Sequence, residues 1–144
     1  MKISVCGKGG SGKSTVVTFL ANQALQKNLD VMVIDADDSN AGLARMLGFE
    51  SPPAPLMDLV GGKSGIKKKM SGQNLLGQEQ IKTGDFEPEF IRRRNGLMFV
   101  AIGKILQNME GCACPMGVLN REFLKKIRLE EKQIAIVDME VLSP

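Results

Sequence analysis

Histidine is absent from this chain, and so are tryptophan and tyrosine. Without histidine, imidazole acid–base catalysis, Ser-His-Asp triads and His-ligated metal sites are excluded. Six Phe make up the whole aromatic content, so we expect no stacking platform for single-stranded nucleic acid. These absences turn the search for function toward phosphate, carboxylate and thiol chemistry.

The chain also lacks a long apolar run and a recognisable signal peptide. No run approaches the ~18 residues that a membrane-spanning helix needs. The net charge of +3 does not by itself indicate nucleic-acid binding. Three Cys without a secretion signal suggest a reducing compartment. We therefore predict a cytoplasmic protein with neither a membrane nor a nucleic-acid partner.

Composition and length are those of one globular domain. Hydrophobic residues form 43% and charged residues 24% of the 144 residues, which is ordinary for such a domain. A chain of this size buries roughly 70% of its unfolded surface, so its core needs no disulfide or metal. We predict a single domain over residues 1–144.

The hydrophobic pattern predicts a doubly wound α/β domain, with a mainly parallel sheet and helices on both faces. Short apolar runs predict strands at 3–6, 31–34, 97–102 and 134–137. The uninterrupted apolarity of 31–34 is typical of a parallel strand that is covered on both faces. Helical spacing begins at Lys13, with apolar positions at Val17, Leu20, Ala21, Ala24 and Leu25.

Two further regions complete this interpretation. Residues 115–129 are predicted as a helix with Val118, Leu119, Phe123 and Ile127 facing inward. Residues 51–90 are rich in Pro and Gly and poorly periodic, so we interpret them as a partly helical surface excursion.

Residues 7–14, GKGGSGKS, match the phosphate-loop pattern G-x-x-x-x-G-K-[ST]. Glycines let backbone N–H groups turn toward a phosphate, and the next helix adds its positive N-terminus. Lys13 would reach the β- and γ-phosphates, Ser14 would ligate Mg²⁺, and Thr15 would donate to the α-phosphate. An ordinary glycine-rich turn is the alternative. The predicted nucleotide-binding residues are Gly7, Lys8, Gly9, Gly10, Ser11, Gly12, Lys13, Ser14 and Thr15.

Aspartates follow two of the predicted strands. Asp35 and Asp37 come after the second strand, and Asp138 is predicted to end the fourth. Because strand carboxyl ends surround the ligand crevice of open α/β sheets, these carboxylates should point toward the phosphate loop. Asp138 is placed to hold Mg²⁺ through water. For Asp38 and Ser39 we favour capping of the short helix that follows.

The pair Cys112 and Cys114 precedes Pro115, which suits the first position of a helix. A helix N-terminus lowers thiol pKa values and favours metal binding. Two thiolates are too few for a soft metal, but a twofold dimer would supply four, for tetrahedral Zn²⁺ or square-planar Ni²⁺. A redox pair and two inert thiols remain open. Cys6, in the first strand, is predicted to be buried and to serve packing.

The phosphate loop KGGSGKST resembles the deviant Walker A motif of the MinD, ParA and nitrogenase-iron-protein group of dimeric ATPases. The resemblance implies that Lys8 crosses a dimer interface to the partner's nucleotide, as an arginine finger does. It also implies that Asp37 orients or deprotonates the attacking water, with Asp35 supporting the magnesium shell.

The segments DADDSNAGLARMLG, GKILQNMEGCACPMG and DME, together with this loop, resemble the CooC-type ATPases that mature nickel-containing carbon monoxide dehydrogenase. The similarity covers nearly the whole chain to Glu140. It implies a homodimeric Mg-ATPase whose Cys112 and Cys114 bind Ni²⁺ (or Zn²⁺) at the dimer interface, with carbon monoxide dehydrogenase as client. A ParA- or MinD-like partition or positioning ATPase, and a non-hydrolysing metal- or partner-binding remnant, are the alternatives.

Two further features of the sequence are its last residues and two clusters of basic side chains. Family members continue after DME with Ala-Gly, whereas Val141 and three further residues follow here, so we expect a C-terminally truncated chain. The basic patches are Lys63, Lys67, Lys68 and Lys69, and Arg92, Arg93 and Arg94. We favour solvated charge for both. Docking of an acidic partner protein is the alternative, with nucleic acid or anionic lipid as the rival partner.

Overall fold

The computed structural model describes residues 1–37, 42–62, 76–103 and 115–140. The predicted metal ligands Cys112 and Cys114 lie outside the described residues. The same holds for Asp38 and Ser39 and for the lysine patch at 63–69.

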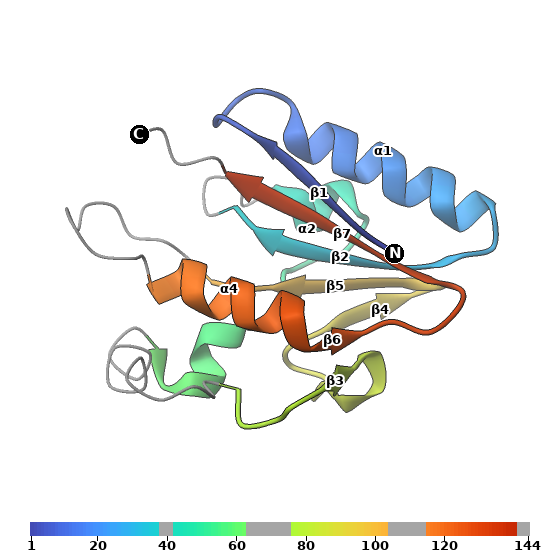
Figure 1. Cartoon of the computed structure of the whole chain (residues 1–144). Coiled ribbons are helices and arrows are strands. Elements are labelled where there is room, and N and C mark those ends of the chain that lie inside the picture. Colours follow the sequence, from blue (N-terminus) through green and yellow to red (C-terminus); the bar gives the residue numbers. More distant parts are fainter. Residues whose placement is uncertain (38–41, 63–75, 104–114, 141–144) are drawn as a thin grey trace.

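A five-stranded sheet forms the centre of the molecule, in the order β1-β7-β2-β5-β4 (Figure 1). Its strands are β1 (Lys2–Gly7), β2 (Asp30–Ala36), β4 (Arg92–Arg94), β5 (Leu97–Ala101) and β7 (Gln133–Glu140). Only the β4–β5 pairing is antiparallel; the other three pairings are parallel. The prediction of a mainly parallel sheet is confirmed, and each of the four predicted strands is present.

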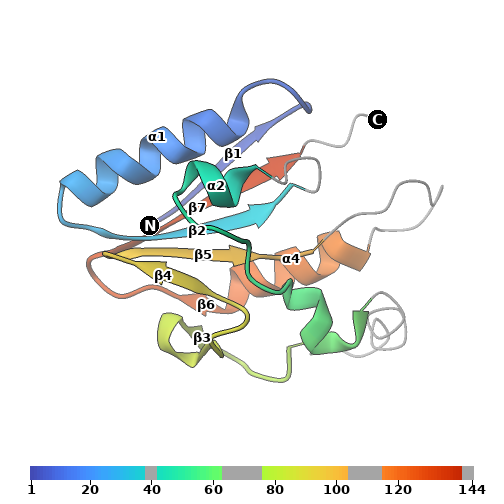
Figure 2. The ribbon, with the colours of Figure 1, turned by 180° about the vertical axis from the view of Figure 1, so that it is seen from behind.

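Helices cover both faces of the sheet, as predicted (Figures 1 and 2). Helices α1 (Lys13–Gln26) and α2 (Leu43–Met46) pack on one face, and α4 (Pro115–Lys126) packs on the other. Strand β2 serves both layers, because successive side chains of a strand point to opposite faces. Val31 and Val33 pack with α1, whereas Met32 and Ile34 pack with α4. All four are fully buried, which explains the uninterrupted apolar run.

The region predicted as a surface excursion contributes to the core, so that interpretation is wrong in part. The 3-10 helix η1 (Leu56–Val60) buries Leu56 and Val60 beside Phe123 of α4. Strand β3 (Ile81–Lys82) is followed by the 3-10 helix η2 (Thr83–Asp85) and pairs in parallel with β6 (Ile127–Arg128). This pairing also ends α4 at Lys126, three residues before the predicted end, because Ile127 takes up strand geometry.

Cys6 is exposed, which contradicts its predicted burial. Within the described residues β1 lies at the end of the sheet and pairs with β7 alone. Its side chains alternate, so Lys2, Ser4 and Cys6 are exposed while Ile3 and Val5 are half-buried. A strand at a sheet edge with one face uncovered leaves half of its side chains in solvent. Packing is therefore not the role of the Cys6 side chain in this part of the fold.

The three arginines of β4 bind backbone carbonyl groups, although Arg93 and Arg94 are also exposed, in line with the favoured prediction of solvated charge. Arg92 donates to the carbonyl oxygens of Ser51, Pro52 and Pro88. Arg93 donates to the carbonyl oxygen of Thr83. Arg94 donates to the carbonyl oxygens of Leu47 and Gly48, at 3.1 and 2.7 Å, and lies over the Phe49 ring.

Arg94 thereby satisfies acceptors that the C-terminal end of α2 leaves without helical partners. Because these guanidinium groups hold neighbouring loops against the sheet edge, we assign the arginine patch a structural role.

Candidate nucleotide-binding site

The phosphate loop connects the end of β1 at Gly7 to the start of α1 at Lys13. Gly10 and Gly12 have φ angles of +77° and +87°, in the left-handed region that side chains disfavour. Gly12 is the N-cap of α1, and no side chain caps the helix there. No side-chain cap thus occupies the N-terminus of α1, where backbone N–H groups and the helix dipole create positive potential that favours an anion.

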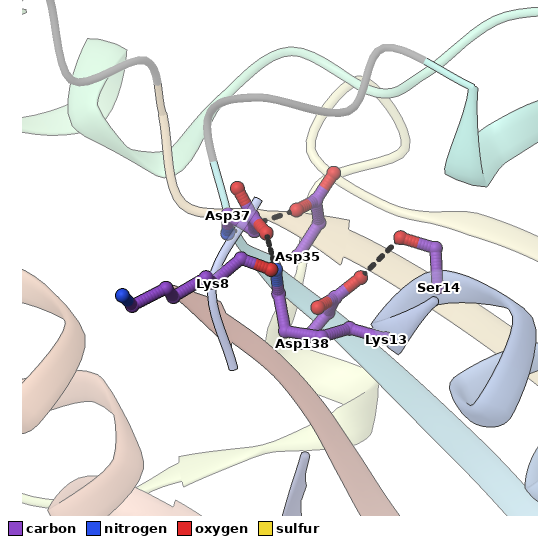
Figure 3. A network of polar contacts seen from close by, with 6 residues as sticks. All are labelled: Lys8, Lys13, Ser14, Asp35, Asp37 and Asp138. Carbon is purple, nitrogen blue, oxygen red and sulfur yellow. Dashed lines mark hydrogen bonds and ion pairs between the residues drawn. The ribbon is translucent and has the colours of Figure 1, made fainter. Parts of the chain in front are cut away.

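Lys13 pairs with Asp37 at the centre of the site (Figure 3). Its Nζ lies 2.8 Å from Asp37 Oδ2, and the two side chains are only 5% and 1% exposed. Nζ also donates to the backbone carbonyl of Lys8 at 3.0 Å. Burial lowers the pKa of Lys13, but the hydrogen bond and charge of Asp37, with the charges of Asp138 and Glu140, raise it above its usual value. The ammonium group therefore stays protonated at neutral pH.

Ser14 and Asp138 form the second contact of the site. Ser14 Oγ donates to Asp138 Oδ2 at 2.7 Å, although the two residues are 124 positions apart. Asp138 is completely buried. Its Oδ1 has no hydrogen-bond partner among the described residues. Burial raises the pKa of Asp138 and the Asp37 charge raises it further, while the Ser14 hydrogen bond and Lys13 oppose this rise. Among the described residues, Asp138 is thus a buried carboxylate with no hydrogen-bond donor on one of its oxygens.

The prediction that β7 ends at Asp138 is wrong by two residues. The strand continues to Glu140, because Asp138 pairs with Val5 of β1 on one side and Asp35 of β2 on the other. This register places the Asp35 and Asp138 backbones side by side. Asp35 Oδ1 accepts the backbone N–H of Asp37 at 3.1 Å, so Asp35 holds the turn that aims Asp37 at Lys13.

The fold brings most of the predicted site residues together. Lys13, Ser14 and Asp37 line a cavity of about 370 Å³ together with Gly10, Gly12, Thr15 and Met46. Lys8 is exposed, and its side chain points away from the carboxylates (Figure 3). Within residues 1–37, 42–62, 76–103 and 115–140, no group of three or more His, Cys, Asp or Glu is placed to hold a metal ion.

Glu140 is a site residue that the sequence reasoning missed. It lies opposite Gly7 in the β1–β7 register. Its Oε1 is 3.5 Å from the point where a Cβ on Gly9 would stand. The signal available in the sequence was a second carboxylate two positions after Asp138, on the same face of the strand. Its charge contributes to the raised pKa of Lys13.

Comparisons with known proteins agree with this geometry. The family model of the CobQ/CobB/MinD/ParA nucleotide binding domain matches residues 3–141. An uncharacterized ATP-binding protein of Methanocaldococcus jannaschii is 44% identical over 97% of this chain and 58% of its own length. The carbon monoxide dehydrogenase accessory protein CooC of Rhodospirillum rubrum is 31% identical over 97% of this chain and 54% of its own length.

The chain thus spans a little over half the length of these relatives. In the part of the chain that the structure describes, no helix is long and apolar enough to cross a membrane. The match over residues 3–141 and the α/β fold around the phosphate loop lead to one conclusion: the chain belongs to the CobQ/CobB/MinD/ParA family of P-loop nucleotide-binding domains.

Proposed function

We propose that this protein is a cytoplasmic Mg-ATPase that works as a homodimer and couples nucleotide hydrolysis to metal delivery. The observation that carries the ATPase part is the convergence of Lys13 and Ser14 of α1 with Asp37 after β2 and Asp138 of β7. Family membership supports nucleotide binding. The delivery part rests on the likeness to CooC.

Mg²⁺ fits the residues that are present. Asp138 Oδ1 is buried without a described partner, and Ser14 Oγ lies against the other oxygen of the same carboxylate. Mg²⁺ prefers such hard oxygen ligands and is bound in proteins through one or two carboxylates together with substrate phosphates. Ser14 and Asp138 would hold the ion, with Asp35 in support. When bound, Mg²⁺ would neutralise charge that develops on the phosphate oxygens.

The chain's own groups have separate roles in hydrolysis. The Lys13 ammonium and the loop N–H groups bind and orient the β- and γ-phosphates. Asp37 accepts a proton from the attacking water as its oxygen bonds to the γ-phosphorus, while the bond to the bridging oxygen breaks and ADP leaves. Asp35 keeps the backbone of Asp37 in place through its hydrogen bond.

Lys8 acts in the partner's site under this proposal. It is exposed and directed away from its own carboxylates (Figure 3), which suits a cation that reaches another protomer. There it would neutralise charge on the transferred phosphoryl group. Lys13→Ala should abolish ATP turnover, and Lys8→Ala should lower it in an enzyme-concentration-dependent way. Equal turnover in wild type and Lys8→Ala would refute the role of Lys8 across the dimer.

Metal delivery is the finer part of the proposal. Cys112 and Cys114 of two protomers would form a four-thiolate site for Ni²⁺ (or Zn²⁺) as cargo, with carbon monoxide dehydrogenase as the client. Equilibrium dialysis with Ni²⁺ should give about one ion per two chains. The double variant Cys112→Ser/Cys114→Ser should lose this ion, with Cys6→Ser as the matched control. Unchanged stoichiometry in the double variant would favour the rival reading, a ParA- or MinD-like partition or positioning ATPase.

A further inference from the structure

The ammonium group that should bind phosphate already has a carboxylate partner in this fold. Asp37 Oδ2 lies 2.8 Å from Lys13 Nζ, in surroundings that exclude water from both side chains. This distance is that of a charge-assisted hydrogen bond. A phosphate oxygen bound to Lys13 would make the same kind of contact from the same cavity. Phosphate and Asp37 therefore compete for one buried cation.

Two further contacts hold Asp37 in this competing position. Asp35 Oδ1 accepts the backbone N–H of Asp37 and so fixes the turn after β2. The Lys13 ammonium is in turn held toward the loop by the Lys8 carbonyl oxygen at 3.0 Å. Glu140 adds negative charge near Lys13 without an ion pair to it among the described residues. Backbone groups of the phosphate loop and of the turn after β2 therefore hold both partners of the ion pair in position.

We infer that the Lys13–Asp37 ion pair is an autoinhibitory contact in which Asp37 stands in the place of a nucleotide phosphate. The inference rests on the proposed nucleotide-binding function of the same site. Phosphate binding to Lys13 displaces the Asp37 carboxylate, and only the displaced carboxylate is free to accept a proton from water. Nucleotide binding and release of the Asp37 carboxylate from Lys13 then occur together. Asp37 therefore cannot act as the general base until a phosphate is bound to Lys13.

The competition is measured by calorimetric titration of the full chain with Mg-ADP, which is not hydrolysed. Asp37→Asn keeps the side-chain shape but removes the charge that opposes phosphate. If the paired form outnumbers the open form about ten to one, the variant binds Mg-ADP about tenfold more tightly than wild type. Glu140→Gln is the comparison variant, because it removes a charge near Lys13 without breaking the pair. Any gain in affinity from this variant should be smaller than the gain from Asp37→Asn.

The possible outcomes separate the autoinhibitory contact from the proposed nucleotide-binding function. Tighter Mg-ADP binding by Asp37→Asn than by wild type, without an equal gain in Glu140→Gln, supports the autoinhibitory contact. The same holds if Asp37→Asn binds and wild type binds too weakly to measure. Equal affinity of wild type and Asp37→Asn overturns the contact and leaves the proposed function intact. An equal gain in Mg-ADP affinity in Asp37→Asn and Glu140→Gln also overturns the contact. Repulsion between carboxylates and the nucleotide phosphates would then explain the gain without any ion pair. If neither wild type nor Asp37→Asn binds Mg-ADP, both the autoinhibitory contact and the proposed function are overturned. Circular dichroism verifies folding, and Asp37→Ala replaces Asp37→Asn if the latter does not fold.

Discussion

Asp138→Asn should make the folded protein more stable while it weakens Mg-nucleotide binding. Asp138 is completely buried, and one of its oxygens lacks a described hydrogen-bond partner. The nearby Asp37 carries the same sign of charge, and Lys13 is the one buried cation among the described residues. A buried charge without a partner costs more than a neutral polar group without one, for which the cost is about 1–3 kcal/mol. Removing the charge while keeping an acceptor for Ser14 should recover about 1–2 kcal/mol of unfolding free energy.

Thermal and urea unfolding measure this gain in the absence of Mg²⁺ and nucleotide. For a chain of this size, 1–2 kcal/mol corresponds to a rise in Tm of roughly 3–8 °C. The same variant should bind Mg-ADP more weakly than wild type, because it loses a magnesium ligand. A fall in Tm would refute the argument, since it would mean that the Asp138 charge stabilises the fold through Lys13 and Ser14.

The pH dependence of this difference follows from the raised pKa of Asp138. A carboxyl whose pKa is higher in the folded state takes up its proton in the folded state first. The charged Asp138 therefore lowers the free energy of unfolding of wild type at neutral pH. This loss of stability disappears as the pH falls through the raised pKa toward the ordinary aspartate value. The stability difference between Asp138→Asn and wild type should be largest near pH 7 and should vanish in acid. A difference independent of pH would contradict the assignment of the gain to charge.

Three further predictions concern the framework of the site. Phe123→Ala should lower the unfolding free energy by about 3–5 kcal/mol in urea titration, because Phe123 is fully buried; a loss below 1 kcal/mol would show that the core around α4 collapses without cost. Arg94→Ala should lose about 1 kcal/mol through its carbonyl contacts, whereas exposed Arg121→Ala should be near neutral. Gly12→Ala should cost about 1–2 kcal/mol by backbone strain alone, since a Cβ there meets no atom within 4 Å; an unchanged Tm would contradict it.

Periodic patterns predicted the elements well where they were long and buried. The apolar run at 31–34 and the helical spacing after Lys13 both correspond to elements that contact two or more neighbours. Prediction was weakest at 51–90, because short 3-10 turns and two-residue strands carry no period that a sequence can display. Cys6 was misjudged for a related reason: strand propensity does not tell whether a strand lies at the centre or the edge of its sheet.

By itself, the sequence determined the local chemistry of this protein. The spacing of Gly7, Gly12, Lys13 and Ser14 predicts a phosphate loop, because backbone N–H groups and a helix N-terminus need only neighbouring residues to form an anion site. The tertiary structure alone decided that Lys13 pairs with Asp37, that Ser14 meets Asp138 across 124 positions, and that the β4 arginines bind carbonyl groups. Such contacts depend on strand order and register, which bring distant residues together and which no local pattern encodes.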